Sequence, residues 1–565
     1  MGSKRSISVA FLLLFFVIPP VEGTTTSYAD FTFDASVLPL EAAYDYIVVG
    51  GGTAGCPLAA TLSESHRVLV LERGGAPEEF PSVGRQDGFL RTLLEEEAPD
   101  SPAQFFVSQD GVPNSRGRVV GGSSAINAGF YSHAHATFFD RCGAGGTVTA
   151  WDMALVNESY NWVERALVFR PVLRSWQEAV RDGLLEAEVT PYNGFTLEHV
   201  AGTKIGGSTF DSNGRRHSAA DLLGFANPAN IQVAIRATVE RILLSPIPRG
   251  AFLLSPALSS LTLTFWLMLY SYTVGLRGRS QNQVRAVGVE YRDRKGHRHR
   301  AMTRVGGEVI LSAGALGSPQ LLLLSGVGLR QYLSAWGIPV ALNLPDVGQH
   351  MYDNPRNGIS FVPSVRIEQS LTQVVGIPRD DAAFIEAASN VMPFLSPSRT
   401  AFLSHPSFPL FMNVATVMAK VAGPLSSGSL RLASLDARDN PLVRFNYFAR
   451  VEDLARCVNG VRRLRDVLYG RSMARLRMRS ARRRRDFRFV GPTLPRNMSN
   501  NVEVARFCRR TVATLWHYHG GCVSGKVVDG EFRVMGAAAL RVVDGSIFNV
   551  SPGTNPQATL MMMGR

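Results

Sequence analysis

The sequence predicts an α/β protein of more than one domain, and two observations carry this prediction. A β-branched run at residues 47–49 is followed by closely spaced glycines, an apolar helical pattern and a second strand, which is the order of a βαβ unit. The length of 565 residues exceeds what one simple core accommodates. With 45% hydrophobic residues, 53 glycines and 31 prolines, the chain is typical of a globular, loop-rich enzyme.

The segment YDYIVVGGGTAGCPLAATLSESHRVLVLERG, residues 44–74, has a dinucleotide-binding pattern. Gly50 allows a tight turn after the first strand, Gly52 lets the backbone approach a pyrophosphate, and Gly55 lets the helix pack on the strand. The helix N-terminus offers N–H groups to the phosphates. The second strand ends at Glu72, whose carboxylate we expect to accept hydrogen bonds from ribose hydroxyls. This pattern alone does not choose between NAD and FAD.

Further motifs resemble those of the glucose–methanol–choline (GMC) oxidoreductases, which hold FAD. They occur in the expected order at residues 117–131 (GRVVGGSSAINAGFY), 314–328 (GALGSPQLLLLSGVG), 514–522 (TLWHYHGGC) and 540–565. The segments at residues 157–171 and 202–223 are similar to the plant HOTHEAD-like and mandelonitrile-lyase-like branch. The resemblance therefore runs from residue 44 to the last residue.

The resemblance implies two domains that are built from interleaved segments of the chain. A Rossmann-like FAD-binding domain would take residues 44–155, 201–345 and 506–565. A substrate domain, an antiparallel sheet with helices on one face, would take residues 156–200 and 346–505.

The resemblance also implies a set of cofactor-binding residues and no metal site. The pyrophosphate would lie on Gly50, Gly52, Thr53, Ala54 and Gly55, and the ribose on Glu72 with Arg73 beside it. The flavin would run along Val119, Ser123, Asn127, Ala128, Gly129 and Phe130, and the backbone of Val239 would contact the adenine. The remaining members are Trp516, His517, Asp544, Gly545, Asn555, Pro556, Gln557 and Ala558, where Trp516 either packs beside the ring or belongs to the core.

Two of these residues are expected to be catalytic. The family pattern H-x-x-G-[TG]-C falls on His517, which the resemblance places against the flavin. Residues two apart on a helix diverge by roughly 200°, so a turn here would leave His519 packed elsewhere or on the surface. Histidine, with a pKa near 6.5, suits removal of a hydroxyl proton at neutral pH while carbon gives hydride to flavin N5. Asn555 can donate to or accept from the substrate oxygen but cannot take its proton, so it is the orienting partner.

The activity implied by the resemblance is oxidation of an alcohol CH–OH group. For this branch the implied substrates are long-chain ω-hydroxy fatty acids, which become ω-oxo acids; the sequence does not indicate the electron acceptor or the oligomeric state. One alternative is a hydroxynitrile (mandelonitrile) lyase that uses FAD without redox turnover. Such lyases carry histidine at both positions and need a cationic environment for cyanide, which Asn555 does not provide.

A second alternative is an inactive family member, disabled by an apolar insertion within residues 245–280. Its centre, residues 251–276, contains 26 residues without a charge, long enough for a membrane helix. The strand-like runs on both sides belong to one domain of the family, so we expect an insertion and no stable membrane span.

The N-terminus is typical of a secretory signal. Lys4 and Arg5 precede an apolar run at residues 9–18 that is too short to span a bilayer. We place cleavage near Gly23, which removes residues 1–23 and directs the protein to the extracellular space or the endomembrane lumen. The net charge of +13 is concentrated in residues 471–488, which contain nine arginines. We interpret them as a solvated surface segment and expect no nucleic-acid partner; an acidic polysaccharide is the more plausible polyanion.

Five cysteines cannot all pair within the chain, although secretion would permit disulfides. We expect Cys457 and Cys508, which flank the basic segment, to form one. Cys56 and Cys522 lie in glycine motifs, where a small apolar side chain is sufficient explanation. Glycosylation acceptors occur at Asn157, Asn497 and Asn549, of which Asn549 is the least expected to be used because it lies close to the expected site.

Overall fold

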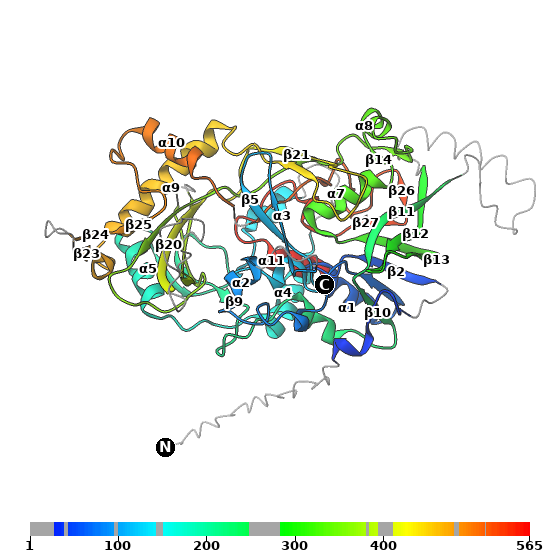
Figure 1. The fold of residues 1–565 in the computed structure, drawn as a ribbon, viewed down its shortest axis with the longest axis horizontal. Coiled ribbons are helices and arrows are strands. Elements are labelled where there is room, and N and C mark those ends of the chain that lie inside the picture. Colours follow the sequence, from blue (N-terminus) through cyan, green and yellow to red (C-terminus); the bar gives the residue numbers. More distant parts are fainter. Residues whose placement is uncertain are drawn as a thin grey trace, which may run out of the picture.

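The computed structural model describes residues 27–38, 43–94, 100–142, 151–247, 283–379, 383–393, 411–479, 485–514 and 516–565. Two large sheets lie toward opposite ends of the long axis, and the C-terminal helix lies between them (Figure 1). The expected signal peptide and the apolar segment 251–276 lie outside the described residues.

The first sheet has nine strands. Its parallel part runs in the order β1 (Thr32–Asp34), β10 (Ile231–Ile235), β3 (Val68–Leu71), β2 (Tyr44–Val49), β13 (Arg298–Leu311) and β27 (Leu540–Val542). An antiparallel meander extends it from β13 through β12 (Val284–Arg292) to β11 (Thr238–Pro246), and β26 (Ala537–Ala538) pairs with β12. The first, middle and last parts of the chain thus share one sheet.

Helices cover both faces of the parallel strands. Val48 and Val70 pack with helices α1 (Gly55–Ser63) and α11 (Gln557–Gly564). Their neighbours Ile47 and Leu71 face the opposite way, into the cluster that contains helix α7 (Gly314–Leu324). Continuous apolar runs such as VLVL in β3 are the pattern expected of strands that are buried on both faces.

The second sheet has seven strands. Their order is β25 (Arg488–Val490), β17 (Arg356–Val362), β20 (Phe411–Lys420), β19 (Phe384–Pro393), β18 (Val374–Ile377), β8 (Gly202–Ile205) and β7 (Tyr192–Phe195). All pairs are antiparallel except β7–β8. Helices α5 (Ser175–Glu186) and α9 (Val451–Tyr469) pack on one face, and α10 (Asn501–Arg510) packs against α9. The predicted fold class, with helices on one face of an antiparallel sheet, is confirmed.

Two of the predicted domain boundaries fall inside structural units. Strand β8 begins just beyond residue 200, yet it belongs to the second sheet. Helix α10 spans the predicted boundary between residues 505 and 506 and packs on α9 of the second domain. Strand pairing places β8 in the second sheet, and packing on α9 places α10 in the second domain; no local pattern encodes either contact.

Shorter elements complete the fold. The helices are α2 (Phe89–Leu94), α3 (Ala136–Cys142), α4 (Met153–Leu167) and α8 (Arg330–Ala335). The strands are β4 (Ala103–Val107), β5 (Pro113–Gly117), β6 (Phe130–Tyr131), β9 (Gly207–Ser208), β14 (Val327–Gly328), β15 (Leu342–Asn343), β16 (Gln349–Met351), β21 (Gly428–Arg431), β22 (Leu442–Arg444), β23 (Met478–Arg479) and β24 (Arg485–Asp486).

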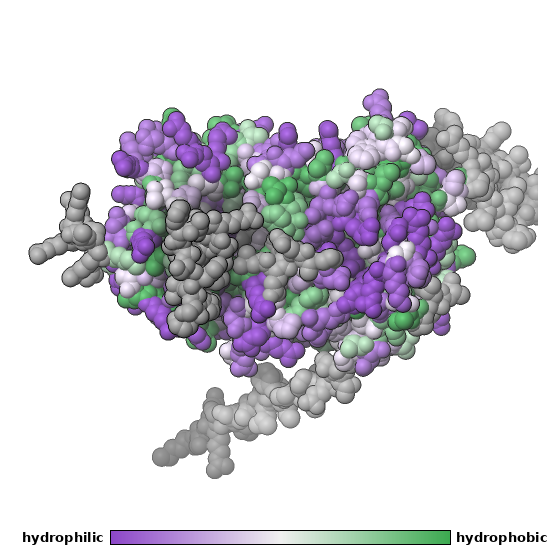
Figure 2. Space-filling model, viewed as in Figure 1, coloured by the Kyte–Doolittle hydropathy of each residue, from purple (hydrophilic) through white to green (hydrophobic). Residues whose placement is uncertain are grey.

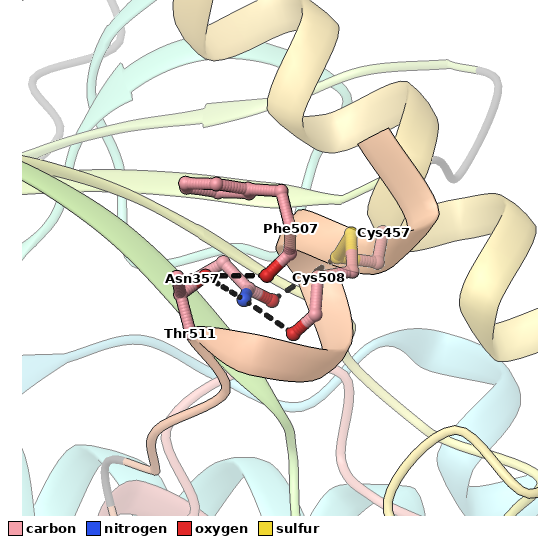
Figure 3. The surroundings of a disulfide bond; sticks show 5 residues. All are labelled: Asn357, Cys457, Phe507, Cys508 and Thr511. Atoms are coloured by element: carbon pink, nitrogen blue, oxygen red, sulfur yellow. Dashed lines mark hydrogen bonds between the residues drawn. A yellow bond between two sulfur atoms is a disulfide. The ribbon is translucent and has the colours of Figure 1, made fainter. Parts of the chain in front are cut away.

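A disulfide joins α9 to α10. Cys457 and Cys508, separated by 51 positions in sequence, have Cα atoms 6.3 Å apart, so the predicted pairing is confirmed. Asn357 of β17 donates hydrogen bonds to the Cys508 carbonyl at 2.9 Å and to the Thr511 hydroxyl at 2.8 Å (Figure 3). The C-terminal end of α10 is therefore fixed to the second sheet just before the chain reaches residues 516–522.

The described surface is polar over much of the face shown in Figure 2, with hydrophobic residues scattered among hydrophilic ones. Within the described ranges, no helix combines the length and apolarity needed to cross a membrane. Two of the three candidate glycosylation sites, Asn157 and Asn497, are exposed. The amide nitrogen of Asn549 instead donates to the Arg141 carbonyl at 3.3 Å.

Candidate active site

A cavity connects the first sheet to the second. Its empty volume is about 1750 Å³, with the opening to solvent included. Val49, Leu71 and Ser312 line it where β2, β3 and β13 end, and Thr372 and Glu386 line it at the second sheet. Ligands of open α/β sheets bind at the carboxyl ends of the strands, so a cofactor held there would reach toward the second sheet.

The turn between β2 and α1 fits a pyrophosphate. Gly50 has φ +103°, and a Cβ atom at this position would lie 2.5 Å from the Ser312 carbonyl oxygen. A Cβ atom on Gly55 would lie 2.0 Å from the Gly50 carbonyl oxygen. Helix α1 starts after Ala54, which supplies no side-chain cap. The Cys56 N–H donates to the Gly52 carbonyl oxygen at 3.0 Å, and Pro57 has no N–H. The N–H groups available for phosphate oxygens are therefore those of the turn itself, from Gly52 to Gly55.

Glu72 lies beside this turn and lines the cavity. Its Oε2 accepts a hydrogen bond from the Gly51 N–H at 3.0 Å, and its Oε1 accepts one from the Gly74 N–H at 2.8 Å. These bonds fix the carboxylate, which can accept further hydrogen bonds from ribose hydroxyls because each oxygen has two lone pairs. Burial raises the pKa of Glu72 and lowers that of Arg73, next to it, to about 10.

Side-chain hydrogen bonds link the distant segments that close the cavity. Asn127 donates to Gln557 Oε1 at 2.8 Å, and Gln557 in turn donates to the Phe130 carbonyl at 2.6 Å. Asp544 accepts from the Gly314 N–H at 3.0 Å and from the Ser546 N–H at 2.8 Å. The last segment of the chain is thereby held against the start of α7 and the motif at residues 117–131.

The cavity gathers the predicted cofactor-binding residues, with three differences. All of them line it except Gly55, Val119 and Ala558. Gly55 lies behind the turn, against Gly50, whereas Val119 and Ala558 are fully buried in the walls. Val119 and Ala558 belong to apolar clusters that pack behind the cavity walls.

His517 lines the cavity and is 7% exposed. Burial lowers its pKa well below the usual value, and the nearby charges of Lys420 and Arg356 lower it further. The His517 Nδ1 lies 3.4 Å from the amide nitrogen of Asn354. The Oδ1 of Asn354 accepts a hydrogen bond from the Gly423 N–H at 3.1 Å, which fixes the orientation of the amide group. The contact between Asn354 and Nδ1 favours the His517 tautomer with the proton on Nε2. A net hydrogen bond contributes about 1 kcal/mol, so a long contact of this kind biases the tautomers by no more than about tenfold.

His519 points elsewhere. The chain turns at Trp516, which has φ +60°. The His519 Nδ1 lies 3.0 Å from the His517 carbonyl oxygen, and the His519 ring stacks on Tyr352 with centroids 5.3 Å apart. Burial lowers the pKa of His519 to about 4. His517 and Trp516 line the cavity and His519 does not.

Asn555 lies on the wall near His517 and is held by a residue that the sequence analysis did not single out. Lys420 Nζ donates to Asn555 Oδ1 at 3.1 Å. Lys420 is fully buried, 3.8 Å from Glu386 Oε2. Arg356 of β17 lies opposite Lys420 of β20 in the strand register. The sequence pattern that could have identified Glu386 and Lys420 is a single charged residue within an apolar strand, as in FIEAAS and VATVMAK. Charged residues are rarely buried without a partner, so such a residue indicates a specific role.

A parallel sheet with a dinucleotide-binding turn, a second sheet and a cavity with a buried histidine between them are the features of an enzyme that binds a dinucleotide cofactor. The N-terminal domain model of the GMC oxidoreductases matches residues 44–356, and the C-terminal one matches residues 424–564. The chain belongs to this family, and its cofactor is FAD.

Relatives named as lyases and a relative named as an alcohol oxidase are both similar to this chain over nearly its whole length. An (R)-mandelonitrile lyase-like protein of Arabidopsis thaliana is 58% identical and covers 95% of this chain and 91% of its own length. (R)-mandelonitrile lyase 1 of Prunus serotina is 44% identical (95% and 88%). A sinapyl alcohol oxidase of Nesocodon mauritianus is 43% identical (97% and 92%). Protein HOTHEAD of Arabidopsis thaliana, at 42% identity (93% and 87%), completes the predicted branch.

Solved structures confirm the fold. Formate oxidase of Aspergillus oryzae superposes with a TM-score of 0.70 at 20% sequence identity, over 93% of this chain and 97% of the other.

Proposed function

We propose that this GMC oxidoreductase oxidises an alcohol, with His517 as the base that takes the hydroxyl proton. The observation that carries the proposal is a buried histidine on the cavity wall whose pKa is lowered by burial. The ring is therefore neutral at physiological pH, and its Nε2 would accept the hydroxyl proton in the tautomer that carries the ring proton on Nδ1, which the contact with Asn354 disfavours by no more than about tenfold. FAD, when bound, accepts the hydride that leaves the carbinol carbon.

Asn555 would orient the substrate oxygen. Because Lys420 occupies its Oδ1, the amide nitrogen is the group that remains for the substrate. An amide nitrogen donates hydrogen bonds only, so Asn555 would hold the hydroxyl oxygen while His517 removes the proton. The two residues then have distinct roles, and neither can replace the other.

For the substrate, we propose a long-chain ω-hydroxy fatty acid that is converted to the ω-oxo acid. The family resemblance supports this class, and the alcohol oxidase among the relatives supports the reaction type. The test is anaerobic addition of an ω-hydroxy fatty acid to the purified holoenzyme, with the oxidised-flavin absorbance band as readout. Bleaching that His517→Gln abolishes supports the proposal. The control is His297→Gln, since the His297 side chain is 71% exposed.

A persistent flavin band with every alcohol offered would contradict the oxidation. Protein purified without any flavin band would instead support the inactive alternative, in which the apolar insertion disables the enzyme. Both results are obtained from the same spectra.

The second candidate is a hydroxynitrile lyase, and one observation favours it. Lys420 places a cation 3.1 Å from Asn555, in a position to attract cyanide. A lyase would release cyanide and benzaldehyde from mandelonitrile without a change in the flavin spectrum. Release of cyanide from mandelonitrile, together with a flavin that no alcohol bleaches, would support the lyase over the alcohol oxidase.

We also propose that the protein is secreted. The buried disulfide between Cys457 and Cys508 is typical of an oxidising compartment. N-terminal sequencing of the mature protein should begin near Thr24. A mature protein that starts at Met1 would contradict secretion through this signal.

A further inference from the structure

The two faces of the second sheet have different chemistry. Along β19, Ile385 and Ala387 enter the apolar cluster beneath the helices, while Glu386 between them lines the cavity. Lys420 at the end of β20 follows Ala419, which belongs to the same apolar cluster. Successive side chains of a strand alternate between faces, so the charged residues share the face turned toward the cofactor domain.

These charges form a compact, buried group. Lys420 Nζ lies 4.0 Å from the centroid of the Phe384 ring and 3.8 Å from Glu386 Oε2, and it donates to Asn555. Arg356 lies directly opposite Lys420 in the sheet. Two like charges at opposed positions destabilise a sheet, and the carboxyl groups of Glu386 and Asp353 offset them. The pair of Lys420 and Glu386 is neutral overall.

Glu386 nevertheless lacks hydrogen bonds. Its side chain is 0% exposed, and within the described ranges neither of its carboxylate oxygens has a hydrogen-bond partner. The 3.8 Å contact with Lys420 is longer than a hydrogen bond. A buried polar group without a partner is destabilising by about 1–3 kcal/mol, and a charged one by more. A carboxylate of this kind on a cavity wall indicates a ligand that brings its own hydrogen-bond donor.

We propose that Glu386 accepts a hydrogen bond from a second hydroxyl group of the substrate. The preferred substrates would be alcohols that carry a further hydroxyl, phenolic or aliphatic, near the carbinol. The inference rests on the proposed alcohol oxidation and deepens it. Lys420 contacts both Asn555 Oδ1 and Glu386 Oε2, so these oxygens are separated by no more than the combined length of the two contacts. One small molecule can therefore reach both residues.

The proposal also ranks the fatty substrates. A plain methylene chain next to the reacting carbinol would cover the Glu386 carboxylate without a hydrogen bond, which is unfavourable. A hydroxy fatty acid with a second hydroxyl near its reacting end would supply the missing donor. Glu386 would thus determine specificity, and its role would depend on the substrate offered.

The first test compares matched alcohols on the wild-type holoenzyme. The pairs are benzyl alcohol against 3- and 4-hydroxybenzyl alcohol, and 1-butanol against 1,3- and 1,4-butanediol. We expect at least one hydroxylated member of each pair to have a higher kcat/KM, by about tenfold, since hydrogen bonds to charged groups are worth about 1.5–3 kcal/mol. No preference in either pair would overturn the proposal, and this comparison requires no variant.

The second test uses Glu386→Gln, which keeps the shape and removes the charge. We expect the preference for the second hydroxyl to fall by about tenfold, because a neutral acceptor forms the weaker bond. The readout is the ratio of kcat/KM within each pair, because loss of the Glu386 charge also acts on Lys420 and, through it, on Asn555, and so changes both members of a pair together. An equal loss for both members of a pair would indicate a merely structural role and would overturn the assignment.

A third measurement is independent of turnover. Benzaldehyde and 4-hydroxybenzaldehyde are titrated into the oxidised holoenzyme, and binding is followed by the perturbation of the flavin band. Tighter binding of the hydroxylated aldehyde, lost in Glu386→Gln, supports the site even if no alcohol bleaches the flavin, in which case only the proposed oxidation fails. Where no alcohol is turned over, equal affinities of the two aldehydes for the wild-type protein would refute the subsite.

Discussion

Removal of the disulfide between α9 and α10 should strongly destabilise the domain that contains the second sheet. The bond closes a loop of 51 positions. In the chain-entropy model, such a cross-link reduces the conformational freedom of the unfolded chain and contributes about 4 kcal/mol. The double variant Cys457→Ala, Cys508→Ala also leaves small cavities, because Cys457 and Cys508 are 3% and 0% exposed. Both effects lower the free energy of unfolding.

The assay is urea denaturation of the holoenzyme, followed by tryptophan fluorescence. With an m value of about 2–3 kcal/mol/M, a loss of about 4 kcal/mol lowers the midpoint by roughly 1.3–2 M urea. Reductant should shift the wild-type midpoint toward that of the double variant and leave the double variant unchanged, which separates the cross-link from side-chain packing. If the wild-type and variant midpoints coincide, the loop-closure reasoning is refuted.

The remaining predictions concern the base and the glycine turn. Because the base must be unprotonated, kcat/KM should fall only as pH drops through the lowered pKa of His517, with an acid limb well below pH 6.5; a limb at pH 6.5 or above would contradict this. Lys420→Met removes a charge that lowers this pKa, so the acid limb should move to higher pH, and an unmoved limb would exclude the coupling. In the variant Asn354→Asp the new carboxylate would accept a hydrogen bond from Nδ1–H of His517, so the acid limb of the pH profile should also move to higher pH. Gly55→Ala places a methyl group 2.0 Å from a carbonyl oxygen and should lower FAD retention more than tenfold, whereas Gly84→Ala, with no atom within 4 Å, should retain the wild-type flavin content.

The sequence predicts the cofactor half of this molecule far better than the substrate half. Gly50, Gly55 and Glu72 act through local backbone geometry, and their spacing in one βαβ unit is enough to identify them. Glu386 and Lys420 lie on neighbouring strands in which Glu386 is paired with Met418, and they reach Asn555 only through the packing of two domains. No local pattern contains that juxtaposition. The sequence therefore shows only that a charge interrupts an apolar strand.

The same cluster changes the argument between oxidation and cyanohydrin cleavage. The uncharged Asn555 was expected to leave the site without the cation that cyanide needs, but Lys420 lies 3.1 Å from its side chain. That cation is already matched by Glu386 at 3.8 Å and engaged by Asn555. Arg356 is a further cation in this cluster, and together with Lys420 it lowers the pKa of His517, so a leaving anion would meet two cations as well as the Glu386 carboxylate. In the proposed oxidation the hydroxyl would lose its proton to His517 and the carbinol carbon its hydride to the flavin, so the product would be a neutral carbonyl. The Glu386 carboxylate without donors, and not the net charge of the cluster, is thus the feature that supports a substrate with a second hydroxyl group.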